Sequence, residues 1–254
     1  MSQQTASPHR LTAEVWIVLG LSLGSSAIYA VLRMVDRLTR EVPLAQQSTA
    51  LNTSLNPRPW LDLLYQLVGI GLGIVPVALA LYLLGAQGGS AARRIGLLPR
   101  WGDLGGGLLL AAVIGLPGLG LYVLGRALGI TVQVQAATLD PTWWAVPVLV
   151  LSALKNAVLE EVIAVGYLVE RLRELRWGVA AIVVASALLR GAYHLYQGFG
   201  PFVGNAVMGV VFTWWYLRTR RVAPLVLAHF AIDLVAFVGY LLLPAELLAG
   251  IGVR

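Results

Sequence analysis

The sequence contains no cysteine and few charged residues for its length. Without cysteine, disulfide bonds, thiolate metal sites and a cysteine nucleophile are all excluded. Charged residues make up 12% of the 254 positions, whereas soluble domains carry roughly 25%. Hydrophobic residues make up 58%, and the mean hydropathy is +0.79. This balance excludes an ordinary soluble domain and indicates a multi-pass membrane protein.

The charge that is present is mostly basic, with a net charge of +6. In a soluble protein this excess would suggest nucleic-acid binding. Here the arginines fall in short segments between apolar runs, which is the pattern that orients membrane proteins. We therefore expect a lipid bilayer as a partner, no nucleic acid, and a location in the cell membrane.

Long apolar runs follow one another along the chain. A helix needs about 20 apolar residues to cross a bilayer. On this basis the sequence predicts an all-α, polytopic transmembrane helical bundle with about seven spans, eight being the alternative count. The predicted spans are Val15–Met34, Leu61–Leu84, Leu104–Leu124, Trp143–Val169, Gly178–Gln197, Phe202–Leu217 and Val222–Leu243.

Arginines cluster after the second, fourth and sixth predicted spans. By the positive-inside rule these three loops are cytoplasmic, with the N-terminus inside and the C-terminus outside. Arg33, Arg37, Arg40 and Arg58 count against this orientation, because they would then lie outside. The three clusters are Arg93, Arg94 and Arg100, then Arg171, Arg173 and Arg176, then Arg218, Arg220 and Arg221.

Two adjacent carboxylates, Glu160 and Glu161, lie inside the fourth apolar run. A charged side chain near the bilayer centre costs at least ~2.5 kcal/mol, and such residues usually mark ion paths, proton relays or catalytic sites. The alternative is a structural pair with Lys155, with Arg190 or with a backbone carbonyl. Two glutamates in succession favour a functional site.

Two histidines lie in later apolar runs. If the chain turns at Trp177-Gly178, positions whose numbers add to about 355, such as Glu161 and His194, lie at the same height. His229 and Asp233 are four apart and share a helix face. A single histidine in an apolar helix is more often a packing residue than a ligand or catalytic residue. Together with the glutamates they predict one site, because a glutamate and a histidine can share a proton and activate water.

The ordered set of these motifs resembles the CPBP family of intramembrane proteases. This family is related to the type II CAAX prenyl endopeptidase and to bacteriocin-immunity proteins. The resemblance covers about Ala153 to Tyr240. It rests on Glu160-Glu161, Gly166-Tyr167-Leu168, His194-Leu195-Tyr196-Gln197-Gly198, Gly204-Asn205-Ala206 and the His229–Asp233 pair.

The resemblance implies an endopeptidase that hydrolyses a membrane-anchored protein or peptide, prenylated or unmodified. Glu160 and Glu161 then supply the base, and His194 orients or shares the proton. His229 and Asp233 complete the site by steadying the oxyanion. We expect no cofactor, since a glutamate mechanism suits these residues better than the runner-up, a zinc ion held by two histidines and two glutamates.

Two positions depart from the family pattern. Val165 stands where the family has an arginine, and Arg190 stands where it has a phenylalanine. Positions 165 and 190 also add to 355, so they share a level of the predicted hairpin. Our hypothesis is that the arginine has moved across the hairpin and keeps its charge near the same carboxylates, helping one of them to stay ionised.

The chain then divides into four parts. They are a polar N-terminal tail (1–14), N-terminal transmembrane helices (15–142), a CPBP-type catalytic helical core (143–243) and a C-terminal tail (244–254). The rival function is a non-catalytic transporter or immunity-type binding protein that uses the cluster as a proton or ion site. Transporters usually show paired repeats, and the first half of this chain has no matching cluster, which favours the protease.

Overall fold

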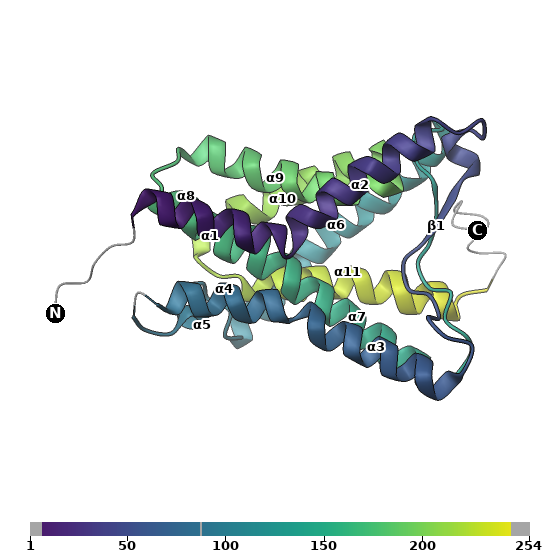
Figure 1. Cartoon of the computed structure of the whole chain (residues 1–254), viewed down its shortest axis with the longest axis horizontal. Coiled ribbons are helices and arrows are strands. Elements are labelled where there is room, and N and C mark those ends of the chain that lie inside the picture. Colours follow the sequence, from purple (N-terminus) through teal and green to yellow (C-terminus); the bar gives the residue numbers. More distant parts are fainter. Residues whose placement is uncertain (1–6, 87, 245–254) are drawn as a thin grey trace.

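The computed structural model describes residues 7–86 and 88–244, so residues 1–6 of the predicted N-terminal tail and residues 245–254 of the predicted C-terminal tail lie outside the described residues. The described chain is nearly all helical, as predicted, and forms a bundle of long helices (Figure 1). The elements are α1 (Pro8–Gly20), α2 (Leu23–Leu38), η1 (Leu44–Gln46), β1 (Ser48–Ala50), α3 (Pro59–Gly73), α4 (Val75–Gly85), α5 (Ala91–Arg94), α6 (Trp101–Ala127), β2 (Gln133–Gln135), α7 (Ala145–Glu160), η2 (Glu161–Tyr167), α8 (Leu168–Glu174), α9 (Val179–His194), η3 (Leu195–Gln197), α10 (Phe199–Thr219) and α11 (Ala223–Leu242).

Fewer helices than predicted have the length and hydropathy of a membrane span. In the described residues four qualify, and a fifth is added if the bent pair α1–α2 is taken as one span. The fourth predicted span (Trp143–Val169) folds as α7, η2 and part of α8, and the sixth (Phe202–Leu217) lies within α10. Neither has the length and hydropathy of a candidate membrane span. The predicted count of seven is therefore not confirmed. The four helices are Pro59–Gly85, Trp101–Ala127, Val179–Gln197 and Ala223–Leu242.

The first predicted span is not one straight helix. The chain bends by 54° between α1 and α2. The Ser22 hydroxyl donates to the Val18 carbonyl at 2.5 Å, a back-bond that tends to bend helices. Helix α1 begins at Pro8, within the predicted polar tail, and the Ser7 hydroxyl accepts from the Arg10 amide at its start.

One end of the bundle carries a small parallel sheet. Strand β1 pairs with β2, with Ser48 opposite Gln133. The pairing joins the connection after α2 to the connection after α6, two segments far apart in the sequence (Figure 1). The polar region between the first two predicted spans is thereby an ordered part of the fold.

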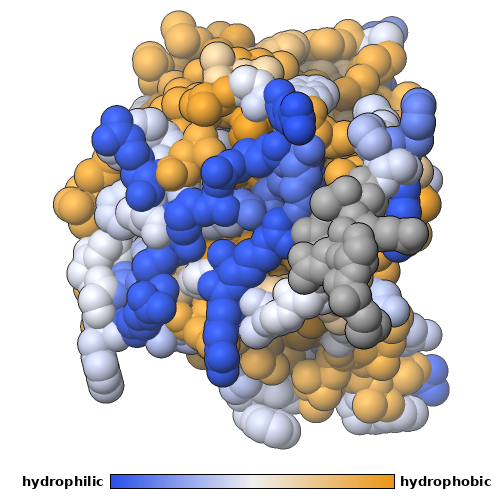
Figure 2. All heavy atoms as spheres, turned by 90° about the vertical axis from the view of Figure 1, so that its left-hand side faces the viewer, coloured by the Kyte–Doolittle hydropathy of each residue, from blue (hydrophilic) through white to orange (hydrophobic). Residues whose placement is uncertain are grey.

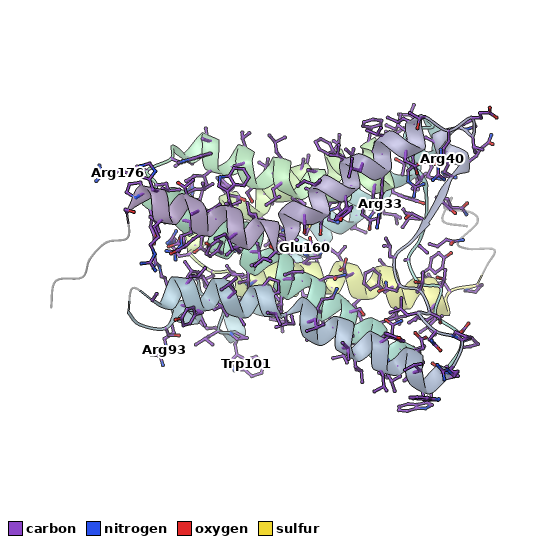
Figure 3. All side chains as sticks on the ribbon, viewed as in Figure 1. Arg33, Arg40, Arg93, Trp101, Glu160 and Arg176 are labelled. Atoms are coloured by element: carbon purple, nitrogen blue, oxygen red, sulfur yellow. The ribbon has the colours of Figure 1, made fainter. Side chains whose placement is uncertain are left out.

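The other end is rich in arginine. Arg93, Trp101 and Arg176 lie there, whereas Arg40 lies at the sheet end (Figure 3). Hydrophilic side chains crowd this arginine-rich end in the space-filling view (Figure 2). Arg171 bonds Glu14 at 3.1 Å and Glu174 at 2.7 Å, which ties α1 to α8. The three arginine loops thus share one end, as the positive-inside argument requires, while the orientation in the membrane stays a prediction.

The core of the bundle surrounds η2, a segment of π-helix whose seven residues are all buried. Helix α9 packs against α10, and α11 packs against α6 and α7. The Ser186 hydroxyl on α9 donates to the Ala164 carbonyl at 2.8 Å, so the wider π turn finds a partner across the hairpin. Short π segments inside α-helices occur often at functional sites.

Candidate active site

The two glutamates lie where α7 passes into η2. Glu160 is the last residue of α7, and Glu161 is the first of η2. Figure 3 shows Glu160 near the middle of the molecule, far from both ends. The Glu161 side chain is fully buried, whereas 13% of the Glu160 side chain is exposed. Adjacent residues of one sequence motif therefore meet different surroundings.

Glu161 is held by two partners on one oxygen. Arg190 Nη2 donates to Glu161 Oε1 at 2.6 Å, and His229 Nδ1 lies 2.7 Å from the same oxygen. An ionised carboxylate can only accept, so His229 Nδ1 is the donor. Glu161 Oε2 has no hydrogen-bond partner among the described residues. These bonds join the motif on η2 to α9 and α11.

Glu160 is held more loosely. The Tyr193 hydroxyl donates to Glu160 Oε2 at 2.7 Å. Arg190 Nη1 lies 3.6 Å from that oxygen and His229 Nε2 lies 3.9 Å from it. Because it is partly exposed and makes a single short bond, Glu160 is the carboxylate that a water molecule can reach.

His229 and Asp233 lie one turn apart on α11, as predicted. Asp233 Oδ1 is 3.7 Å from His229 Nε2. With Nδ1 bonded to Glu161, the Nε2 atom faces both Glu160 and Asp233. Two acids therefore lie near Nε2, at 3.9 and 3.7 Å.

His194 ends α9, and its position fixes its tautomer. Nδ1 lies 3.1 Å from the Arg190 carbonyl oxygen. A carbonyl only accepts, so Nδ1 carries the hydrogen and Nε2 of the neutral ring is an acceptor. The ring lies against Tyr193, with centroids 4.7 Å apart. Glu160 acts on this histidine electrostatically.

The predicted hairpin register is displaced. Glu160 contacts Tyr193 across the hairpin, and their numbers add to 353 rather than 355. The turn occupies four residues, 175–178, between α8 and α9, so its centre lies one residue earlier than predicted. His194 therefore lies beyond the level predicted for it. Tyr193 was missed by the sequence reasoning, although its place beside His194 was a signal.

Arg190 lies where the transposition hypothesis requires. Its side chain is fully buried and reaches both carboxylates. The guanidinium also lies over the Phe212 ring, 5.5 Å from the centroid. Val165 is fully buried in the core around η2. Five of the six side chains that the sequence selected pair with one another, namely Glu160, Glu161, Arg190, His229 and Asp233. The His194 ring lies beside them against Tyr193, whose hydroxyl bonds Glu160.

The donor set does not suit a zinc ion. Within residues 7–86 and 88–244 no group of three histidine and carboxylate side chains is arranged to hold a metal. Glu161 Oε1 is already shared by Arg190 and His229. The Arg190 guanidinium beside both glutamates supplies the positive charge that a metal would bring, and it would repel a second cation.

Comparison with known families identifies this region. Residues 142–235 match the model of the family described as Type II CAAX prenyl endopeptidase Rce1-like. This segment is similar to the Rce1-like family over about a third of the chain. The matched Rce1-like residues include all six side chains of the site, which agrees with the resemblance seen in the sequence. No curated protein and no solved structure matches the chain.

Proposed function

We propose that this chain is an intramembrane endopeptidase that hydrolyses a peptide bond in a membrane-anchored protein or peptide, prenylated substrates included. The observation that supports this proposal is that two adjacent glutamates differ in their hydrogen-bond partners and in their exposure to solvent. Glu161 is locked by Arg190 and His229 at 2.6 and 2.7 Å, whereas Glu160 keeps access to water. Glu160 is thus the base in this proposal, and Glu161 is a positioning residue.

In the proposed reaction, Glu160 accepts a proton from a water molecule. The water oxygen bonds to the scissile carbonyl carbon while the carbonyl π electrons move onto the carbonyl oxygen. His194 Nε2, the free acceptor, hydrogen-bonds the same water and orients it. The tetrahedral intermediate then collapses, the C–N bond breaks, and the leaving amine takes the proton from Glu160.

The developing oxyanion needs a donor close by. His229 Nε2 lies 3.9 Å from Glu160 Oε2 and donates once the ring is protonated. Asp233 favours that charged ring and orients it, so its own negative charge acts through the histidine. A donor held in place before the reaction is worth about 10²–10³ in rate.

The test is peptide cleavage by the purified protein in liposomes, with farnesylated and unmodified membrane peptides. We expect Glu160→Gln and His194→Ala each to lower the rate by about 10²–10⁴-fold, the usual contribution of acid–base catalysis. Glu41→Gln is the matched control, because Glu41 is exposed and follows Arg40, which lies at the sheet end (Figure 3). If wild type cleaves no peptide, the rival proton or ion function is favoured, and a liposome flux assay tests it.

A chelator arm separates the two chemical classes of protease. A glutamate base needs no metal, so cleavage by wild type should be unchanged in excess chelator. Loss of cleavage that added zinc restores would contradict the glutamate mechanism and establish a metalloprotease.

A further inference from the structure

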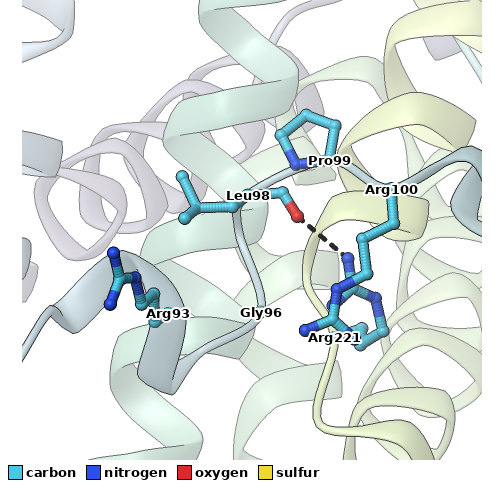
Figure 4. A pocket seen from close by; sticks show the side chains of 6 residues that line it. All are labelled: Arg93, Gly96, Leu98, Pro99, Arg100 and Arg221. Atoms are coloured by element: carbon cyan, nitrogen blue, oxygen red, sulfur yellow. Dashed lines mark hydrogen bonds between the residues drawn. The ribbon is translucent and has the colours of Figure 1, made fainter.

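A pocket of about 220 Å³ lies at the arginine-rich end, outside the active site (Figure 4). It forms where the segment before α6 meets the segment between α10 and α11. Three arginines surround it, and backbone and apolar atoms complete the wall. The lining residues are Arg93, Gly96, Leu98, Pro99, Arg100 and Arg221.

The backbone around this pocket is held firmly. The Val222 amide donates to the Ile95 carbonyl at 3.0 Å, and the Ala223 amide donates to the Gly96 carbonyl at 3.1 Å. Gly96 has a φ of +61°, and a Cβ there would lie 2.5 Å from the Arg220 carbonyl oxygen. Only glycine permits this close approach. The pocket is therefore preformed.

The charge of the pocket is unbalanced. Arg221 bonds Asp103 through two nitrogens and donates to the Leu98 carbonyl at 2.9 Å, a bond drawn in Figure 4. Asp103 is thereby compensated by Arg221. Arg93 and Arg100 are exposed, and neither side chain forms an ion pair within the part of the chain that the structure describes. Two positive charges remain available to an anion.

The residues beside the pocket are of the kind found where a membrane span meets the headgroups. Helix α6, a candidate membrane span, begins at Trp101, directly beside it. Trp101 is 94% exposed, and tryptophan is enriched where a span meets the headgroups. On the next turns of α6, Leu104 and Leu108 are also exposed. Apolar surface for an acyl chain thus adjoins the cationic pocket.

We propose that this pocket binds the phosphate of an anionic phospholipid headgroup. Guanidinium groups match phosphate oxygens in charge and in planar hydrogen-bonding geometry. Free phosphate shares that chemistry, but the adjoining Trp101 and Leu104 favour the lipid. The cytoplasmic leaflet is the anionic one, so this assignment also fits the predicted orientation.

Native mass spectrometry of the protein, released from zwitterionic nanodiscs that contain a small fraction of phosphatidylglycerol, tests the proposal. The variant is Arg93→Gln with Arg100→Gln. The matched control is Arg176→Gln with Arg218→Gln, which removes equal charge from exposed arginines at the same end. We expect the pocket variant to retain phosphatidylglycerol about tenfold more weakly, since each basic residue near the surface contributes severalfold. We expect the control to behave as wild type.

Three results would overturn the proposal. They are equal losses in both double variants, which would indicate general charge attraction, no loss in the pocket variant, or full displacement of the lipid by millimolar inorganic phosphate. Circular dichroism in purely zwitterionic lipid verifies that the pocket variant is folded. The single variants Arg93→Gln and Arg100→Gln form a second series, in which each variant removes only one exposed charge and should weaken lipid retention less than the double variant. None of these measurements depends on proteolysis.

Discussion

Arg190 and Glu161 form an ion pair at 2.6 Å in which both side chains are fully buried. The pair joins α9 to η2, and His229 extends it to α11 through the same carboxylate oxygen. Breaking a buried pair by removing one partner costs about 3–5 kcal/mol, because the remaining charge is left uncompensated. The geometry of the candidate site and the stability of the bundle are therefore coupled at this pair.

Replacing the arginine tests the idea that its charge has moved across the hairpin. We expect Arg190→Phe to abolish cleavage and to lower the free energy of unfolding by about 3–5 kcal/mol, because Glu161 loses its cation. The double exchange Val165→Arg with Arg190→Phe should recover part of the cleavage activity and part of the lost stability, since it restores a guanidinium four residues after Glu161. Cleavage and denaturant unfolding in detergent are measured together. A double variant no better than Arg190→Phe would refute the transposition.

Replacing Glu160 and replacing Glu161 should have different effects on stability and on cleavage. Glu161→Gln leaves Arg190 buried without its close partner, so we expect a stability loss of about 3 kcal/mol. Glu160→Gln should change stability by about 1 kcal/mol or less, the scale of one hydrogen bond, while removing cleavage. Unfolding midpoints and cleavage rates of the two variants provide the comparison. The reverse pattern would make Glu161 the base.

Tyr193 should act through Glu160 rather than on the substrate. Tyr193→Phe removes the 2.7 Å bond and keeps the ring. We expect a stability loss of about 1 kcal/mol and a clear fall in cleavage rate. Tyr216→Phe is the matched control, because the Tyr216 hydroxyl donates to Glu170 at 3.0 Å outside the site. Equal cleavage by the two variants would assign Tyr193 a purely structural role.

Arg171 should stabilise the arginine-rich end without affecting catalysis. Its side chain is 2% exposed and bonds Glu14, Glu174 and the Leu83 carbonyl. We expect Arg171→Met to lower stability by about 3 kcal/mol, since two acids lose their cation. Arg173→Met, at a half-exposed arginine, should change it by less than about 0.5 kcal/mol. Chemical unfolding compares the two, and cleavage per folded molecule should be the same in both.

Two glycines near the pocket should respond oppositely to alanine. Gly96→Ala places a Cβ 2.5 Å from the Arg220 carbonyl oxygen at a φ of +61°, so we expect a loss of at least about 1 kcal/mol. Gly102 lies in α6, and the Cβ of an alanine there would have no other atom within 4 Å. Gly102→Ala should therefore be neutral or stabilise by about 0.5–1 kcal/mol. Thermal unfolding measures both, and unchanged stability in Gly96→Ala would mean that the two segments can separate.

Contacts along one helix were the easiest to predict. His229 and Asp233 lie one turn apart because four residues make about one turn of any α-helix. Contacts across the hairpin were harder, since they depend on where the turn is centred. The four-residue turn is centred one residue earlier than predicted, and Tyr193 rather than His194 reaches across the hairpin to the glutamate pair. The bend between α1 and α2 was not predicted, because a hydropathy profile carries no information on a bond such as that from the Ser22 hydroxyl to the Val18 carbonyl.

The sequence by itself indicated a helical membrane protein and predicted six side chains for its polar site, because buried charge in an apolar run has few explanations. It left the two glutamates equivalent. Only the tertiary structure separated them, since Arg190 and His229 come from α9 and α11 and converge on one oxygen of Glu161. Which partner reaches which carboxylate depends on a π turn and a hairpin register, and both are set by packing between helices rather than by local composition.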